Sequence, residues 1–141
     1  MPSFSHIALN VTDLQRSVQF YTSVLRPLSF HLADSLDGHF ARITNGKDAV
    51  IVLAPVGDKY RDRIYHRRAV GLAHFALAVE TRAQLDEMAK HLASLGVALL
   101  GQGRVESEYR RGYSTFSFED PDRIMIEIVH HDAYYFSTSP P

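Results

Sequence analysis

The sequence contains no cysteine among its 141 residues. This absence excludes disulfides, thiolate catalysis and cysteine-ligated zinc, and it is consistent with a reducing compartment such as the cytoplasm. Fifteen basic and sixteen acidic residues give a formal net charge of −1, so no overall field attracts nucleic acid or an anionic membrane. No stretch approaches the ~20 apolar residues of a membrane span, and the N-terminus lacks the pattern of a secretion signal. We therefore expect a soluble, cytoplasmic protein that binds neither nucleic acid nor membrane.

Several nucleotide and nucleophile motifs are also missing. There is no phosphate-binding glycine loop, no dinucleotide fingerprint and no Gly-x-Ser-x-Gly elbow. What the chain does have is 45% hydrophobic residues, enough at this length to bury the core of one compact domain. We predict a single domain over residues 1–141.

Two stretches of the chain read alike. Residues 4–11 are Phe-Ser-His-Ile-Ala-Leu-Asn-Val, and residues 72–79 are Leu-Ala-His-Phe-Ala-Leu-Ala-Val. When His6 is laid on His74, the histidine, alanine, leucine and valine coincide. Each stretch is followed by Thr-x-x-Gln, the form of a helix capping box. The chain therefore consists of two similar halves.

The first half predicts a strand, a helix and three further strands. Residues 4–11 alternate as a half-buried strand does, and residues 12–25 place apolar side chains on one side of a helix. Strands are expected near 30–33, 39–43 and 49–54, the last two joined at Asn45-Gly46, a strong hairpin signal. The first module is thus βαβββ over approximately 4–54.

The second half repeats this order over approximately 72–130, after a connection at 55–71. A strand at 72–79 precedes a helix from Thr81 that ends near Gly96. Strands are expected near 97–100, 112–118 and 124–129, the last two joined by the Asp120-Pro121-Asp122-Arg123 turn. The predicted fold class is α+β, with two tandem βαβββ modules.

Alternation along the strands divides each predicted sheet into a core face and a second face. Ile126 and Ile128 point to the core, so Glu127 points to the second face. The same reasoning places seven other side chains on the second faces: His6, Asn10, Phe40, Arg42, His74, Thr115 and Ser117, with Tyr113 on the side of Glu127.

Two βαβββ modules, a histidine in the first strand of each, and a glutamate in the last strand after an Asp-Pro-Asp turn resemble the vicinal oxygen chelate superfamily. That group includes glyoxalases, fosfomycin-resistance and bleomycin-resistance proteins and extradiol dioxygenases. The resemblance implies that the mixed sheets of the two modules curl around a cavity for metal and substrate. It also implies a divalent metal ion (Fe, Mn, Ni, Co or Zn) held by His6, His74 and Glu127. Independently of the name, two imidazoles and one carboxylate form a facial triad that leaves positions open for two substrate oxygens.

The remaining candidates have roles around that ion. Tyr113 is the expected group for proton transfer or substrate orientation, and the expected substrate contacts are Asn10, Phe40, Arg42, Thr115 and Ser117. Either histidine taken alone is as readily an ordinary core or surface residue. Glu127 is harder to explain as an ordinary core or surface residue, because burying an unpaired carboxylate between two isoleucines costs free energy. The basic stretch Tyr60–Arg68 could bind an anion, but an exposed connection explains it better.

The residues fit no single subclass of this superfamily. Glyoxalase I has a fourth ligand, a carboxylate, in a region where this chain has Val52. Extradiol dioxygenases have a catalytic tyrosine where this chain has Ser117. Lyase, isomerase and dioxygenase chemistry therefore all stay open, and the alternative is a metal-free protein that sequesters a small molecule, as bleomycin-resistance proteins do.

The resemblance also implies a homodimer. By analogy with other two-module chains of this length, His6 would come from one chain and His74 with Glu127 from the other. The second arrangement, with all three ligands in one chain, is also compatible with the length of the connection.

Overall fold

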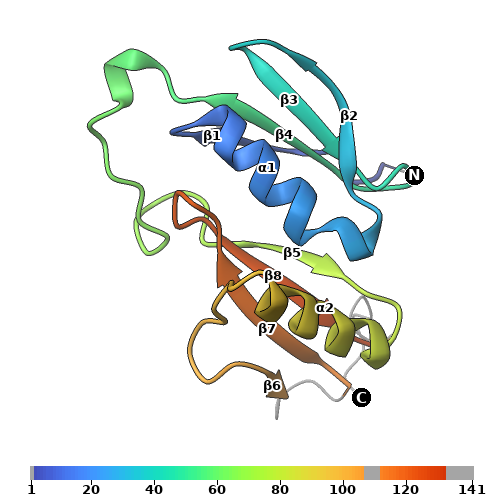
Figure 1. Cartoon of the computed structure of the whole chain (residues 1–141). Helices are drawn as coiled ribbons and strands as arrows, with labels where there is room; N and C mark the ends of the chain where they lie inside the picture. Colours follow the sequence, from blue (N-terminus) through green and yellow to red (C-terminus); the bar gives the residue numbers. More distant parts are fainter. Residues whose placement is uncertain (1, 107–111, 133–141) are drawn as a thin grey trace. The chain divides into compact units, whose positions relative to one another are not determined.

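The computed structural model describes residues 2–106 and 112–132. It divides the chain into two compact units. Unit 1 comprises Met1–His66 with Asp120–Arg123, and unit 2 comprises Arg67–Glu119 with Ile124–Pro141. Each unit contains an open four-stranded sheet and a helix (Figure 1). The predicted α+β fold with two tandem modules is confirmed.

Unit 1 contains a mixed sheet in the order β1-β4-β3-β2. Its strands are β1 (Ile7–Val11), β2 (His31–Leu36), β3 (Phe40–Thr44) and β4 (Val50–Pro55). β1 and β4 are parallel, and the other pairs are antiparallel. The helices are α1 (Leu14–Val24) and two short 3₁₀ turns, η1 (Arg26–Leu28) and η2 (Asp58–Tyr60).

The core of unit 1 lies between α1 and one face of this sheet. Alternate strand residues are buried there, as a period of two requires. The buried residues are Leu9, Val11, Ser17, Tyr21, Val24, Leu25, Ala41, Ile43, Ile51 and Leu53. Side chains of the opposite face, among them Phe40, Arg42 and Val52, are half-buried.

The predicted hairpin at Asn45-Gly46 is confirmed. Gly46 has φ +76°, a conformation that glycine adopts without a steric penalty. The Asn45 side-chain oxygen accepts hydrogen bonds from the backbone N–H groups of Lys47 (3.0 Å), Asp48 (3.2 Å) and Ala49 (3.1 Å). The asparagine side chain therefore closes the turn that sets the register of β3 against β4.

The prediction that Thr12 caps α1 is wrong. Asp13 is the N-cap, and its carboxylate accepts from the Arg16 N–H at 3.0 Å. Thr12 instead donates its backbone N–H, at 3.0 Å, and its hydroxyl to Asp122. Aspartate caps a helix as well as threonine does. Thr12 is not available as the cap because it is hydrogen-bonded to the distant Asp122 carboxylate.

The Asp120–Arg123 turn belongs to unit 1 through a second contact as well. The buried Tyr21 hydroxyl donates to the buried Asp120 carboxylate at 2.9 Å. Burial first, and the neighbouring Asp120 charge second, raise the pKa of Tyr21 far above its ordinary value. The Asp-Pro-Asp turn is thus a structural element whose two carboxylates are both hydrogen-bonded.

Unit 2 has the corresponding order β5-β8-β7-β6. Its elements are β5 (Phe75–Ala78), α2 (Arg82–Ser94), β6 (Val105–Glu106), β7 (Ser114–Glu119) and β8 (Met125–His130). β5 and β8 are parallel, and the other pairs are antiparallel. The capping box that opens α2 is confirmed: the Gln84 N–H donates to the Thr81 hydroxyl, and the Thr81 N–H donates to the Gln84 side chain.

The predicted strand at 97–100 is wrong, because the edge strand of this sheet is β6. The Val97 N–H donates to the Leu92 carbonyl and completes the C-terminal end of α2. At the end of this segment the Leu100 N–H donates to the Ser117 carbonyl at 2.8 Å. Gly101 and Gly103, which follow, both have positive φ angles. The chain is therefore hydrogen-bonded to β7 through Leu100 before it reaches β6. Residues 107–111, between β6 and β7, lie outside the described residues.

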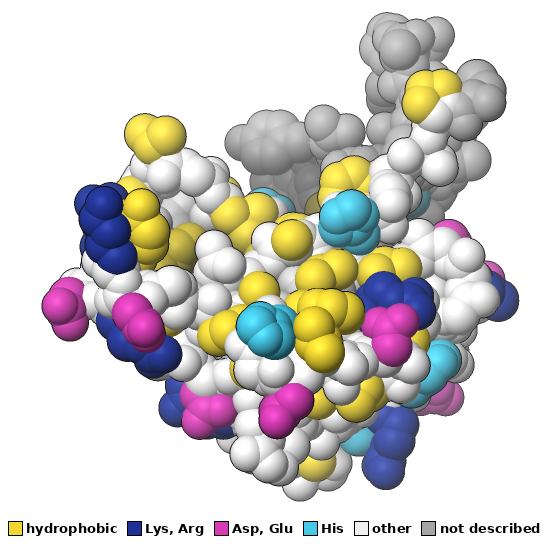
Figure 2. Space-filling model, turned by 90° about the horizontal axis from the view of Figure 1, so that it is seen from above, with side chains coloured by type: hydrophobic (Ala, Val, Ile, Leu, Met, Phe, Trp, Pro, Cys, Tyr) yellow, Lys and Arg dark blue, Asp and Glu magenta, His cyan; other side chains and the backbone are white. Residues whose placement is uncertain are grey.

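The surface carries charges of both signs. On the face shown in Figure 2, lysine and arginine side chains lie beside aspartate and glutamate, in keeping with the near-neutral sequence. Within residues 2–106 and 112–132, no helix has the length and hydrophobicity needed to cross a membrane.

Candidate metal and substrate site

The candidate site in unit 2 lies on the second face of its sheet. In β7 the residues Ser114, Phe116 and Phe118 are buried, and their neighbours Thr115, Ser117 and Glu119 are half-buried on the other face. Ser117 pairs directly with Glu127 of β8. Glu127 is therefore placed on the second face, as predicted, yet only 8% of it is exposed.

Two predicted residues approach the Glu127 carboxylate on separate oxygens. The Tyr113 hydroxyl donates a hydrogen bond to Oε1 at 2.6 Å. His74 Nε2 lies 3.7 Å from Oε2. His74 stands just before β5 and two residues from Ala76, which pairs with Glu127, so strand alternation brings the imidazole to the same face. The structure thus brings Tyr113, His74 and Glu127 together.

A feature that the sequence did not predict holds Tyr113 in place. The His131 ring stacks on the Tyr113 ring, with centroids 6.5 Å apart and planes inclined by 15°. The preceding Gly112 has φ +77°, and a Cβ there would lie 2.7 Å from an Asp132 carboxylate oxygen. Only glycine therefore lets the chain enter β7 at this point with Tyr113 against His131.

The two predicted hydroxyl residues differ in what they can offer a substrate. The Thr115 hydroxyl donates to the Ile128 carbonyl at 2.9 Å, so its hydrogen is used inside the sheet. Ser117 is half-buried and lies directly opposite Glu127. Ser117 is therefore the better placed of the two to orient a ligand beside the carboxylate.

The predicted substrate contacts of unit 1 share the second face of its own sheet. Asn10 is exposed in β1, and Phe40 and Arg42 are half-buried in β3. Arg42 is held by a residue that the sequence did not reveal: its Nε and Nη2 donate to the Asp34 carboxylate at 3.0 and 2.8 Å. The hydrogen bond and charge of Arg42 hold the pKa of Asp34 below its ordinary value, and Asp34 raises that of Arg42.

His6, the third predicted ligand, precedes β1 by one residue and is exposed. Its Nδ1 lies 3.1 Å from the Ser5 hydroxyl. That contact occupies Nδ1, so Nε2 is the ring nitrogen left to act as a ligand.

The donor set of unit 2 fits two ligands of a divalent ion. Two donors at ~2.1 Å from one ion lie about 3.0–3.4 Å apart in octahedral or tetrahedral geometry, slightly less than the 3.7 Å between His74 Nε2 and Glu127 Oε2. Tyr113 on the other carboxylate oxygen has the position of an outer partner that orients a ligand. Across residues 2–106 and 112–132, no three His, Cys, Asp or Glu side chains gather as a complete centre, so the pair is two-thirds of the predicted triad.

Two tandem modules, each with an open four-stranded sheet and a helix, form the fold of the glyoxalase class. The family model for the Glyoxalase/Bleomycin resistance protein/Dioxygenase superfamily matches residues 3–128. The chain belongs to this superfamily, as the sequence resemblance predicted.

Individual relatives cover nearly the whole chain. An uncharacterized protein of Bacillus subtilis, YqjT, is 31% identical over 125 residues, which are 88% of this chain and 95% of YqjT. Lactoylglutathione lyase from Agrobacterium tumefaciens has a similar fold, with a TM-score of 0.70, 18% identity and 96% of each chain covered. The fosfomycin resistance protein FosX from Listeria monocytogenes also has a similar fold, with a TM-score of 0.69 and 19% identity. The match covers 94% of this chain and 96% of FosX.

Proposed function

We propose that this protein is a divalent-metal-dependent enzyme that acts on a small oxygenated molecule bound through two oxygens. Its ligands are His6, His74 and Glu127. The observation that carries the proposal is the buried residue Glu127, which is 8% exposed and whose carboxylate has His74 near one oxygen and the Tyr113 hydroxyl on the other. A buried carboxylate beside an imidazole is costly without a cation or a proton to compensate it.

Each residue has a distinct part in this proposal. A bound divalent ion would act as a Lewis acid toward two neighbouring substrate oxygens. Glu127 supplies the negative charge of the ligand set, and Tyr113 keeps its carboxylate in one orientation. The Tyr113 hydroxyl also carries a proton at hydrogen-bonding distance from Oε1, so it can pass a proton to or from a substrate beside Glu127. Asn10, Phe40, Arg42, Thr115 and Ser117 stay predicted substrate contacts, with Ser117 favoured over Thr115.

The proposal includes a homodimer in which His6 of one chain joins His74 and Glu127 of the other. Support comes from the division of the ligands: unit 2 holds two of the three, and the third belongs to unit 1. A two-fold dimer would form two equivalent sites from such complementary parts.

A metal-free function, sequestering a small molecule, is the second candidate. The half-buried apolar side chains on the second face of unit 1, including Phe40, Val50 and Val52, favour it, since ligand sites are mostly apolar with few polar groups. Lyase, isomerase and dioxygenase chemistry remain open within the first candidate, since fold alone does not choose among them.

Metal content separates the two candidates. Protein stripped by a chelator is dialysed separately against Mn²⁺, Fe²⁺, Co²⁺, Ni²⁺ and Zn²⁺, and bound metal is measured by elemental analysis. We expect about one ion per chain for at least one of these metals. Glu127→Gln should weaken binding by more than tenfold, because it removes the only charged ligand, and the exposed His39→Ala should not. Wild-type protein without metal after saturation would refute the enzyme proposal.

A further inference from the structure

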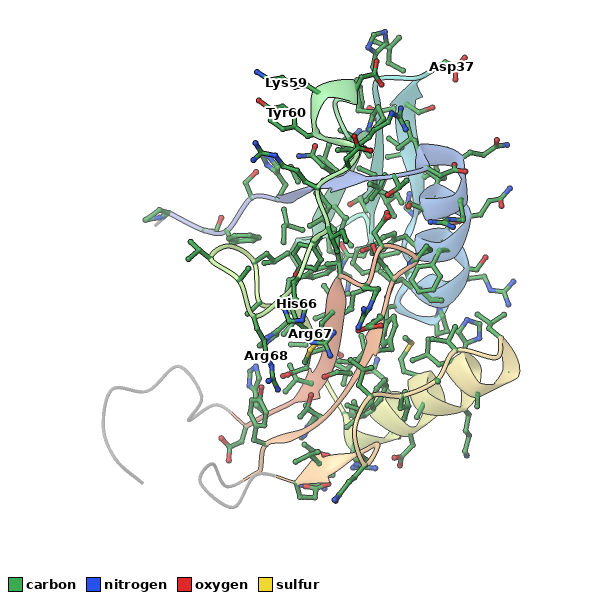
Figure 3. All side chains as sticks on the ribbon, turned by 90° about the vertical axis from the view of Figure 1, so that its left-hand side faces the viewer. Asp37, Lys59, Tyr60, His66, Arg67 and Arg68 are labelled. Atoms are coloured by element: carbon green, nitrogen blue, oxygen red, sulfur yellow. The ribbon has the colours of Figure 1, made fainter. Side chains whose placement is uncertain are left out.

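An ion pair lies on the same face of the unit 2 sheet as His74 and Glu127, two of the three candidate metal ligands. Arg67, the first residue of unit 2, contacts the Glu119 carboxylate through its Nη1. Figure 3 shows Arg67 beside the strands of unit 2. The two side chains are 30% and 23% exposed, so the pair is partly buried and still open to solvent.

Strand register fixes where this pair lies relative to Glu127. Glu119 and Ser117 are two residues apart on β7 and point to the same face. Since Ser117 pairs with Glu127 and Glu119 pairs with Met125, the Glu119 position lies one pleat repeat, ~6.8 Å, along the sheet from that of Glu127. The Arg67 guanidinium, which contacts the Glu119 carboxylate, therefore lies on the same face of the sheet, one pleat repeat along the strand direction from the Ser117–Glu127 pair.

Arg67 has donors to spare at this position. A guanidinium has five N–H groups arranged to bind a planar anion through two of them at once. In the part of the chain that the structure describes, Glu119 is its hydrogen-bond partner, and the contact uses one nitrogen. Glu119 thus orients Arg67 and balances its charge, and the remaining N–H donors of the guanidinium can bind a second anion.

We propose that Arg67 is a specificity-determining residue that binds an anionic group of the substrate. This inference rests on the proposed function and narrows its substrate class to molecules with two neighbouring oxygens and, at the other end, an anionic group such as a carboxylate. The two oxygens face His74 and Glu127, and the anionic group accepts hydrogen bonds from the Arg67 guanidinium. Glu119 keeps the guanidinium in place and competes with that group for it.

A matched pair of probes tests the inference. Catechol presents two neighbouring oxygens, and 3,4-dihydroxybenzoate adds a carboxylate across the ring. Binding of both to the metal-loaded protein is measured by calorimetry. We expect 3,4-dihydroxybenzoate to bind at least about tenfold more tightly than catechol. Arg67→Gln should remove that preference while leaving catechol affinity unchanged, and Arg67→Lys should restore part of it.

Glu119→Gln distinguishes an anion site from a purely structural ion pair. It removes the competing carboxylate, so the affinity for 3,4-dihydroxybenzoate should rise severalfold. If the ion pair were purely structural, Glu119→Gln and Arg67→Gln would have the same effect. Both would lower thermal stability, and neither would change the ratio of the affinities for 3,4-dihydroxybenzoate and catechol. The control is Arg61→Gln, which removes an exposed arginine that pairs with Asp58; it should leave the preference for the anionic probe as in the wild type.

The outcomes separate this inference from the proposed function. Equal affinity of the wild type for the two probes, or a preference that survives Arg67→Gln, overturns the role of Arg67 even where metal binds. If no metal binds, the enzyme proposal fails, and the role of Arg67 is then decided on the metal-free protein with benzoate. Benzoate binding that Arg67→Gln abolishes and Arg61→Gln preserves supports an anion site; binding equal in all three proteins, or absent from all, overturns it.

Discussion

Glu127 shows how a residue in the middle of a strand can be part of a candidate functional site. Its neighbours Ile126 and Ile128 are buried in the core of unit 2, so alternation turns its carboxylate to the second face. There it is 8% exposed and meets Tyr113 and His74. Sequence reasoning could predict that these residues share one face, because that depends on a period of two and on the pairing of β8 with β5 and with β7.

Tyr113→Phe tests the part that the hydroxyl plays at this carboxylate. Loss of the 2.6 Å hydrogen bond to Oε1 should weaken metal binding by about tenfold, the usual effect of removing an outer partner of a metal ligand. Metal affinity is measured by competition with a chelating dye, and circular dichroism checks the fold. Thr115→Val, which removes a hydroxyl that serves the Ile128 carbonyl, is the control and should leave metal affinity unchanged.

Tyr21→Phe tests the buried contact with the Asp-Pro-Asp turn. At pH 7 the substitution should lower the free energy of unfolding by about 1–3 kcal/mol, because the buried Asp120 loses a donor. The pKa of Tyr21 is raised above its ordinary value of 10.0 in the folded protein. The unfolded state therefore loses its proton first as the pH rises, and wild-type stability should fall above pH 10 by up to ~1.4 kcal/mol per pH unit from this group.

Urea unfolding at pH 7 and at pH 11 measures both effects. The difference in stability between wild type and Tyr21→Phe should shrink at the higher pH, since the variant has no proton to lose at this position. A difference that grows or stays constant would contradict the buried, protonated hydroxyl.

At the scale of elements, the two helices show which local signals are decisive. The Thr-x-x-Gln pattern occurs before both, yet the capping box forms only at Thr81 and Gln84. At α1 the box does not form, because Asp13 is the N-cap and Thr12 is hydrogen-bonded to the distant Asp122. A local motif cannot report a carboxylate that lies 110 residues away in the sequence.

Gln84→Ala and Gln15→Ala test this difference as a matched pair. The Gln84 side chain accepts from the N–H groups of Glu80 and Thr81 at 2.8 and 3.1 Å, so its removal should cost about 0.5–1 kcal/mol. Gln15 takes no part in the cap of α1, and its removal should change stability by less than about 0.5 kcal/mol. Thermal unfolding of both variants measures the effect; equal losses would contradict the assignment of Asp13 as the cap.

Other element-scale errors have the same physical origin. The strand expected at 97–100 has a suitable apolar composition, but its N–H groups serve the end of α2 and a single β7 carbonyl. The Asp34 partner of Arg42 follows from the register of β2 on β3, which shifts between Leu32 and Asp34. The stacking of His131 on Tyr113 depends on the left-handed Gly112. None of these features is encoded by a periodic pattern.

At the scale of the whole molecule, the internal repeat was the strongest signal in the sequence. Aligning His6 with His74 predicted two modules of the same element order, and the structure has two open sheets of the same strand order. The repeat also separates the proposed ligands, because His6 belongs to unit 1 and His74 with Glu127 to unit 2. How the ligands meet is therefore a question about assembly, which no residue pattern answers.

Mixing two inactive variants tests the central claim, one metal ion shared between His6 of one chain and His74 with Glu127 of another. His6→Ala and Glu127→Gln should each bind metal weakly as homodimers. After subunit exchange, half of the dimers combine one chain of each kind, and each such dimer has one intact site, so about a quarter of all sites should recover wild-type metal affinity. Mixing His74→Ala with Glu127→Gln, whose losses fall in the same unit, should restore none. Recovery in the first mixture alone is the result we predict; exchanged dimers that recover no metal binding would contradict the shared site.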